Sequence, residues 1–227
     1  MIKKLIRRVL RLDSTPARAA PVVIPVKKHG IRREALSNAA RRTCEGLHQA
    51  GFQAYVVGGA VRDLLLGRRP KDYDVATDAT PEEVRALFRR SRVIGRRFRI
   101  VHVLCGPEVV EVSTFRGANV IEGDDGRVAD EHGRILRDNV FGTQEQDATR
   151  RDFCINALFY DPATQEIWDY HDGVGDLKRR RLRMIGEPEA RYREDPVRML
   201  RAARLAGSTG LEIEPRARRP KIGRAHV

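Results

Sequence analysis

The chain has 227 residues, and its 44 lysines and arginines against 31 aspartates and glutamates give a formal charge of +13. This length allows one substantial domain and the start of a second. The charge favours polyanionic partners, first nucleic acid and second an acidic membrane surface. A basic soluble protein without such a partner is the alternative. Three scattered cysteines without a Cys-x-x-Cys pair argue against a disulfide framework or zinc site and fit a reducing cytoplasm, and no apolar run is long enough to insert stably in a bilayer.

The first 33 residues have a different composition from the rest of the chain. Residues 1–33 are basic and rich in alanine, proline and valine. No uninterrupted apolar core follows the first charges, as a secretory signal would require. We expect a flexible basic arm, with a basic surface helix or membrane contact as alternatives.

A helix, a strand and a glycine turn are predicted next. Residues 37–50 read as a helix that ends at Gly51. The aromatic and β-branched run over residues 55–57 predicts a short strand. Gly58 and Gly59 then break this strand, and without Cβ atoms they let the backbone turn sharply and a ligand approach closely.

Two aspartates follow this turn. A helix is predicted over residues 60–67 and a second strand over residues 71–77, where Asp72 and Asp74 project to the same side. Adjacent carboxylates repel each other unless a cation lies between them, and their oxygens suit Mg²⁺ that carries a nucleoside triphosphate. A solvated strand end is the alternative. The glycine turn, which opens a helix that can hold phosphates, favours metal-assisted nucleotidyl transfer.

The sheet is expected to continue beyond these strands. Residues 80–88 begin with a capping box and predict a helix. Strands over residues 100–104 and 109–115 would extend the sheet. Glu111 could be a third acidic group near the metals or an exposed strand residue, and the pattern favours neither. The polar stretch over residues 117–133 is expected to be a mobile excursion.

The remaining chain contains arginine-rich segments. Residues 144–160 are predicted to form one helix, in which Arg151 and Asp152 could be a solvated surface pair. The basic run over residues 178–183 is expected to be a solvated loop or strand rim, with direct RNA contact as the alternative.

A last helix is expected to open near Asp195. Asp195 can cap it, and Arg198 lies three residues further on the same face. A capping salt bridge is one account of this pair.

Several of these stretches resemble one known family. Residues 58–67, followed by Asp-Tyr-Asp over 72–74, resemble the signature of the class II nucleotidyltransferases, which include bacterial poly(A) polymerases and CCA-adding tRNA nucleotidyltransferases. Residues 150–152 are similar to the family's Arg-Arg-Asp motif, and residues 194–198 to its Glu-Asp-x-x-Arg motif. The resemblance implies that Asp195 and Arg198 read the base of the incoming nucleotide, and a carboxylate beside a guanidinium suits ATP or CTP. The resemblance covers about residues 45–215.

The resemblance implies roles for individual side chains. Asp72 and Asp74 would hold two Mg²⁺ ions, with Glu111 as a further candidate ligand, and Asp152 would complete the catalytic set. Asp152 would lie at the ribose and Arg151 near the phosphates. The residues expected at the nucleotide are Gly58, Gly59, Arg62, Arg151, Asp152, Asn156, Glu194, Asp195 and Arg198.

The resemblance also implies a fold. We expect a mixed α/β nucleotidyltransferase head, with a small sheet and packed helices, followed by the start of an all-α neck. The expected boundaries are an arm over 1–33, the head over 34–190 and the neck over 191–220. Residues 221–227 resemble a translated sequencing adapter, so we expect a non-native tail on a truncated chain that lacks the downstream helical domains.

The expected reaction is transfer of AMP from ATP to an RNA 3′-hydroxyl, with release of pyrophosphate. Residues 95–103 and 136–142 resemble the poly(A) polymerase branch and favour this reaction. CCA addition to tRNA is the first alternative, because the base-reading motif is shared. A catalytically inactive RNA-binding fragment is the second.

Overall fold

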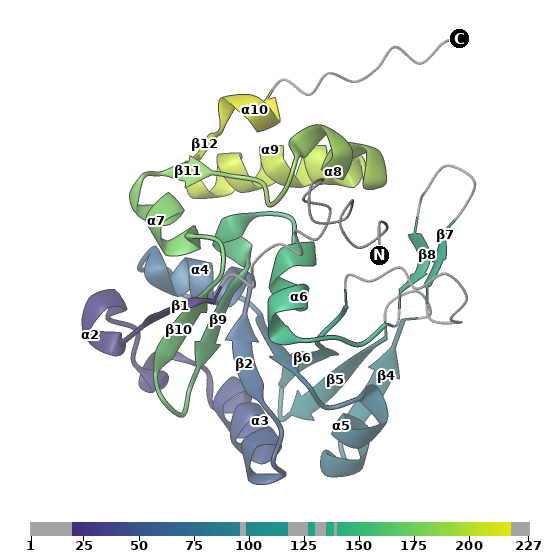
Figure 1. Ribbon diagram of the computed structural model, residues 1–227. Coiled ribbons are helices and arrows are strands. Elements are labelled where there is room, and N and C mark those ends of the chain that lie inside the picture. Colours follow the sequence, from purple (N-terminus) through teal and green to yellow (C-terminus); the bar gives the residue numbers. More distant parts are fainter. Residues whose placement is uncertain (1–19, 96–98, 118–126, 130–134, 139, 219–227) are drawn as a thin grey trace, which may run out of the picture.

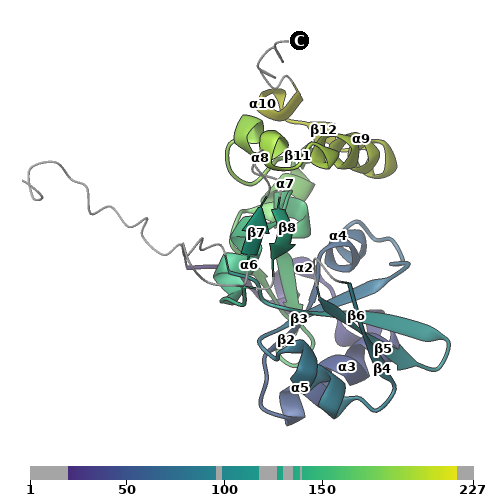
Figure 2. The ribbon, with the colours of Figure 1, turned by 90° about the vertical axis from the view of Figure 1, so that its right-hand side faces the viewer.

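The structure is a computed structural model that describes residues 20–95, 99–117, 127–129, 135–138 and 140–218. These residues form a mixed α/β domain on one large sheet, and further helices form a layer beyond one end of it (Figure 1). The view turned by 90° shows the same helical layer separated from the helices that cover the sheet (Figure 2). The predicted fold class is confirmed.

The main sheet has eight strands in the order β1-β10-β9-β2-β3-β6-β5-β4. All neighbouring strands are antiparallel except β3 and β6, which are parallel. The strands are β1 (Val22–Ile24), β2 (Ala54–Val57), β3 (Tyr73–Thr77), β4 (Ser91–Ile94), β5 (Ile100–Cys105), β6 (Glu108–Thr114), β9 (Leu158–Asp161) and β10 (Glu166–Asp169). Two small sheets pair β7 (Arg127–Ala129) with β8 (Ile135–Asp138), and β11 (Arg181–Leu182) with β12 (Glu212–Ile213).

The helices are mostly short. They are α2 (Val26–His29), α3 (Asn38–Gln49), α4 (Gly59–Leu65), α5 (Pro81–Leu87), α6 (Gln144–Arg150), α7 (Gly173–Lys178), α8 (Pro188–Glu194), α9 (Val197–Thr209) and α10 (Pro215–Arg218). The predicted capping box is present at α5, where the side chains of Thr80 and Glu83 each accept a hydrogen bond from the other residue's backbone N–H. Among the described helices, none has the length and apolarity needed to cross a membrane.

The two faces of the main sheet have different coverings. Val56 and Val75 belong to the large core cluster that also contains apolar residues of α3 and α5. Val57, on the other face, packs in a smaller cluster with Ala148 of α6. Because Asp74 lies opposite Val57 in the strand register, its side chain is on the α6 face, away from α3 and α5.

The single helix predicted over residues 144–160 is wrong. The helix ends at Arg150, a 3₁₀ turn follows at Cys154–Asn156, and β9 then runs over Leu158–Asp161. β9 pairs with β2 on one side and β10 on the other, so it is a buried central strand. A short apolar run of this kind has no period that separates a strand from a buried helix.

Three other boundaries differ from the prediction. The predicted arm is wrong for its last residues, because β1 pairs with β10 at the edge of the sheet; residues 1–19 lie outside the described chain. The predicted excursion over 117–133 contains β7, and its other residues from 118 onward lie outside the description. The expected all-α neck contains β12, which pairs in parallel with β11. Residues 219–227, which include the expected non-native tail, also lie outside the described residues.

Candidate active site

Two neighbouring strands bring three carboxylates together. Asp74 of β3 lies in register with Glu111 of β6, and Asp72 stands two residues before Asp74. Burial, then the charge of Glu111, raises the pKa of Asp74 to about 6; Asp72 adds to this rise, and Arg151 opposes it. A bound cation would relieve the repulsion between these groups. The structure thus supports the grouping of the two aspartates and places Glu111 beside them.

The carboxylate group fits a metal only in part. Within the described residues, no three His, Cys, Asp or Glu side chains are close enough to hold a metal ion by themselves. Glu111 has a half-exposed side chain whose Oε1 lies 3.4 Å from Nε2 of His102. Mg²⁺ commonly takes one or two protein carboxylates and completes its shell with water and substrate phosphates. Asp72 and Asp74 fit that arrangement.

Replacing Asp74 by asparagine is expected to stabilise the fold at neutral pH. The folded carboxyl has its pKa raised from 3.8 to about 6, so the folded state holds a proton that the unfolded state releases, and stability falls as the pH rises through this window. Asp74→Asn removes this effect and should gain about 1–3 kcal/mol above pH 6, and the gain should vanish towards pH 4. Urea unfolding at pH 7 and 4.5 measures it, with Glu45→Gln, an exposed carboxylate of α3, as control. A loss of stability at pH 7 would refute the expectation.

The predicted glycine turn lies against this carboxylate group. Gly58 has φ 70° and ψ −129°, a conformation that residues with a Cβ rarely adopt. A Cβ built there would lie 3.6 Å from Nη1 of Arg151 and 3.9 Å from Oδ2 of Asp74. Gly59 is the first residue of α4. The turn therefore keeps side chains out of the space between Arg151 and Asp74.

Asn156 connects two of the predicted nucleotide-binding arginines. Its Oδ1 accepts a 2.9 Å hydrogen bond from Nη1 of Arg62, and its backbone oxygen accepts a 3.3 Å bond from Nη1 of Arg151. Arg151 also donates to Oδ2 of Asp147 from Nε (3.1 Å) and Nη2 (2.9 Å), and lies 5.1 Å from the ring centre of Phe159. These contacts fix the Arg151 guanidinium.

Asp147 is a positioning residue that the sequence analysis missed. Burial by itself raises its pKa, but the charges of Arg151 and Arg150 prevail and hold the pKa below the ordinary value. Its side chain is only 1% exposed and pairs with both arginines. The spacing of four residues between Asp147 and Arg151 on a helix was the available signal.

Asp152 joins the predicted ribose site to α9. Its side chain is 6% exposed, and Oδ1 accepts a 2.8 Å hydrogen bond from the backbone N–H of Phe153. Nη2 of Arg201 lies 2.9 Å from Oδ2 as an ion pair, but Oδ2 has no hydrogen-bond partner of acceptable geometry in the described chain. The Asp152 carboxylate is therefore held between a backbone N–H and the guanidinium of Arg201. Arg201 was not predicted.

The predicted base-reading pair is arranged differently from the expectation. Arg198 does not pair with Asp195; its Nη1 donates to Oε2 of Glu194 at 2.7 Å. Asp195 instead accepts a 3.2 Å hydrogen bond from the backbone N–H of Val197, at the start of α9. The salt bridge of Arg198 is with Glu194, one residue earlier. Arg191 also binds Glu194, at 2.8 Å, so the Glu194 carboxylate holds both arginines.

The basic run over 178–183 is mainly structural. Asp176 is fully buried, and its carboxylate pairs with Arg179, Arg181 and Arg183 at 3.2, 2.7 and 2.8 Å. Three of the arginines thus neutralise one buried charge. Arg181 begins β11, and direct RNA contact by this run stays a prediction.

Several of the site residues line a cleft of about 580 Å³. One wall contains Asp72 and Asp74, and α9 contributes Arg201 and Arg204 to the lining. Of the predicted site residues, those lining the cleft are Gly59, Arg62, Asp72, Asp74 and Asn156. The arrangement places acidic groups and cationic groups around one space, which suits a metal–triphosphate ligand.

The mixed sheet, the glycine turn and the paired carboxylates define a nucleotidyltransferase head. The sequence profile of the Poly A polymerase head domain matches residues 54–183. The chain belongs to this family, so the predicted family is confirmed.

Named relatives fall into two groups. The chain is 49% identical to "Poly(A) polymerase I" of Escherichia coli O157:H7, over 96% of this chain and 47% of that protein. It is 41% identical to the "CCA-adding enzyme" of Bacillus pumilus, over 74% of this chain and 40% of that protein. The crystal structure of Bacillus stearothermophilus CCA-adding enzyme in complex with CTP is 37% identical and superposes with a TM-score of 0.66, over 79% of this chain and 41% of that one. The chain spans about half the length of the curated relatives it matches.

Proposed function

We propose that the protein transfers AMP from ATP to RNA 3′ ends, repeatedly and without a template. The observation that carries the proposal is the cleft in which Asp72 and Asp74 face cationic side chains of α4 and α9. The 49% identity to Poly(A) polymerase I, against 41% over a shorter stretch for a CCA-adding enzyme, supports ATP as the repeated substrate.

The residues of the cleft have complementary roles in this reaction. The RNA 3′-oxygen bonds to the α-phosphorus of ATP, the bond to pyrophosphate breaks, and the hydroxyl proton leaves to solvent. Asp72 and Asp74 would hold Mg²⁺, which when bound polarises the hydroxyl and neutralises phosphate charge. Arg62, Arg201 and Arg204 line the same cleft and offset the remaining phosphate charge. The protein contributes placement and electrostatics.

The nucleotide would be held by groups with free bonding capacity. The carboxylate of Asp152, paired with Arg201 at 2.9 Å, has further lone pairs that would accept from a ribose hydroxyl. In the described chain, the side-chain bonds of Arg198 all use Nη1, which leaves its other nitrogens for a base. Arg151, fixed by Asp147, would lie near the phosphates. RNA 3′ ends are the proposed partner and the cytoplasm the proposed location.

CCA addition is the second candidate, favoured by the likeness to the CTP complex. An inactive RNA-binding fragment is the third, because the chain spans 47% of Poly(A) polymerase I.

Metal-dependent incorporation tests the proposal. Radiolabelled ATP and a generic RNA primer are incubated with the chain, and with the chain continued by the remaining half of a Poly(A) polymerase I relative. We expect labelled primer with Mg²⁺ and none with a chelator. Absence of incorporation by both proteins in Mg²⁺ would overturn the proposal.

A further inference from the structure

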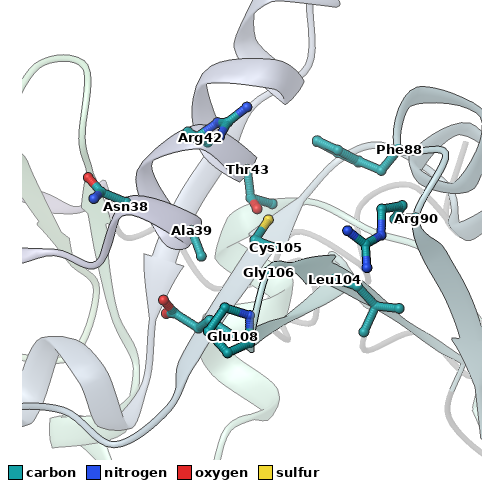
Figure 3. Close-up of a pocket in the computed structure, with 11 residues that line it drawn as sticks. Asn38, Ala39, Arg42, Thr43, Phe88, Arg90, Leu104, Cys105, Gly106 and Glu108 are labelled. Carbon is teal, nitrogen blue, oxygen red and sulfur yellow. The ribbon is translucent and has the colours of Figure 1, made fainter.

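A second hollow lies on the opposite face of the sheet from the catalytic aspartates. It measures about 610 Å³ and is formed by α3, the end of α5 and the β5–β6 turn (Figure 3). Cys105 and Glu108 line it and face each other in the register of β5 and β6. Strand alternation places both on the α3 face, whereas Glu111 is on the Asp74 face. The two sites are therefore separated by the sheet.

Thr43 contributes an unused polar group to this hollow. Its side chain lines the hollow and is fully buried, and its Oγ1 has no hydrogen-bond partner in the described chain. Figure 3 shows the hydroxyl pointing towards Cys105. A buried hydroxyl without a partner costs about 1–3 kcal/mol.

Two arginines give the hollow its charge. Arg42 and Arg90 line it, and neither has a side-chain hydrogen bond or ion pair within the described part of the chain. Glu108 is the acidic group of the lining, and its carboxylate accepts a hydrogen bond from Ser37. The two guanidinium groups are available to attract an anion such as a phosphate into the hollow.

The rest of the lining is largely apolar. Phe88 and Leu104 form part of it, with Pro107 at the turn. Figure 3 shows Phe88 and Arg90 extending from the same side of the hollow. A nucleic-acid base stacks on an exposed aromatic ring with about 1–3 kcal/mol. The volume lies within the range of small-molecule sites, which is larger than a lone phosphate needs.

We propose that this hollow binds one nucleotide unit, with its phosphate at Arg42 and Arg90 and its base against Phe88. Either a free nucleotide or one unit of single-stranded RNA has this chemistry. Binding here does not depend on the catalytic reaction, so the experiment on this hollow tests a proposal that is independent of the proposed function.

Cys105 provides a reporter that lies inside the hollow. It is partly exposed, whereas Cys44 and Cys154 are buried, and burial raises the pKa of both buried thiols. Alkylation of the intact chain, mapped by peptide mass spectrometry, should therefore occur first at Cys105. We expect AMP or a short oligoadenylate to slow it about 5-fold or more, the change that follows from about 80% occupancy of the hollow.

Variants separate this site from the catalytic cleft. The double variant Arg42→Ala/Arg90→Ala should lose the protection while it keeps the unliganded alkylation rate and the melting temperature. The matched control is Arg92→Ala, an exposed arginine of β4 that does not line the hollow. Asp72→Ala should also keep the protection, whether or not it is active. Protection by AMP indicates a free nucleotide, and protection by oligoadenylate alone indicates an RNA strand; both support the proposal.

Three results would overturn it. The first is unchanged alkylation of Cys105 with millimolar AMP and with oligoadenylate. The second is protection that survives in the double variant. The third is equal protection by inorganic phosphate and AMP, which would show that the base makes no contact.

Discussion

Asp72→Ala is expected to lower nucleotide incorporation by about 10³-fold, the loss typical of removing a charged group that stabilises the transition state. Asp72 and Asp74 are the carboxylates of the cleft that also contains Arg62, Arg201 and Arg204. Without Asp72, Asp74 alone would have to hold the metal and position the triphosphate. RNA affinity should change little, because the substitution removes a negative charge and no basic contact.

Single-turnover incorporation of labelled ATP measures this loss, and a filter-binding assay measures RNA affinity. The control is Glu45→Ala, which removes an exposed carboxylate of α3 on the opposite side of the sheet. Near-normal incorporation by Asp72→Ala would remove Asp72 from the active site. An equal loss in Glu45→Ala would show that net charge, not position, causes the effect.

Asp176→Ala is expected to have the largest effect on stability. The carboxylate is fully buried and pairs with Arg179, Arg181 and Arg183. Its removal would leave Arg181 and Arg183 without this counter-charge, whereas Arg179 keeps its ion pair with Asp172. Breaking a buried ion pair costs about 3–5 kcal/mol, and solvent at the partly exposed arginines reduces this to about 2–3 kcal/mol.

Urea unfolding followed by circular dichroism measures the change. Glu189→Ala is the matched control, because its ion pair with Arg193 is much more exposed and should contribute less than about 1 kcal/mol. A loss below about 1 kcal/mol for Asp176→Ala would show that solvent or other groups neutralise the arginines.

Local signals in the sequence predicted the strands and the turn around Asp74 well. The strand before Gly58, the glycine turn and the alternation of Asp72 and Asp74 each depend on a few neighbouring residues. The capping box of α5 is equally local. Such features are determined by short-range sterics and hydrogen bonds, so the sequence alone identifies them.

Features that depend on distant partners could not be predicted in the same way. β9 is a strand because β2 and β10 pair with it. The residues 158–161 themselves contain no signal that predicts this pairing. The pairing of Arg201 with Asp152 joins residues far apart in the chain. Arg179 and its neighbours look like a solvated basic run until Asp176 is seen buried among them.

The most direct test of the central claim is the choice between ATP and CTP. The chain, continued by the remaining half of a Poly(A) polymerase I relative, is supplied with Mg²⁺ and a generic RNA primer, and with either ATP or CTP alone. A second reaction contains both nucleotides and a tRNA that lacks its 3′ end. We predict a ladder of many adenosines with ATP and little extension with CTP. Addition of two cytidines and then a single adenosine to the tRNA would contradict the proposed function.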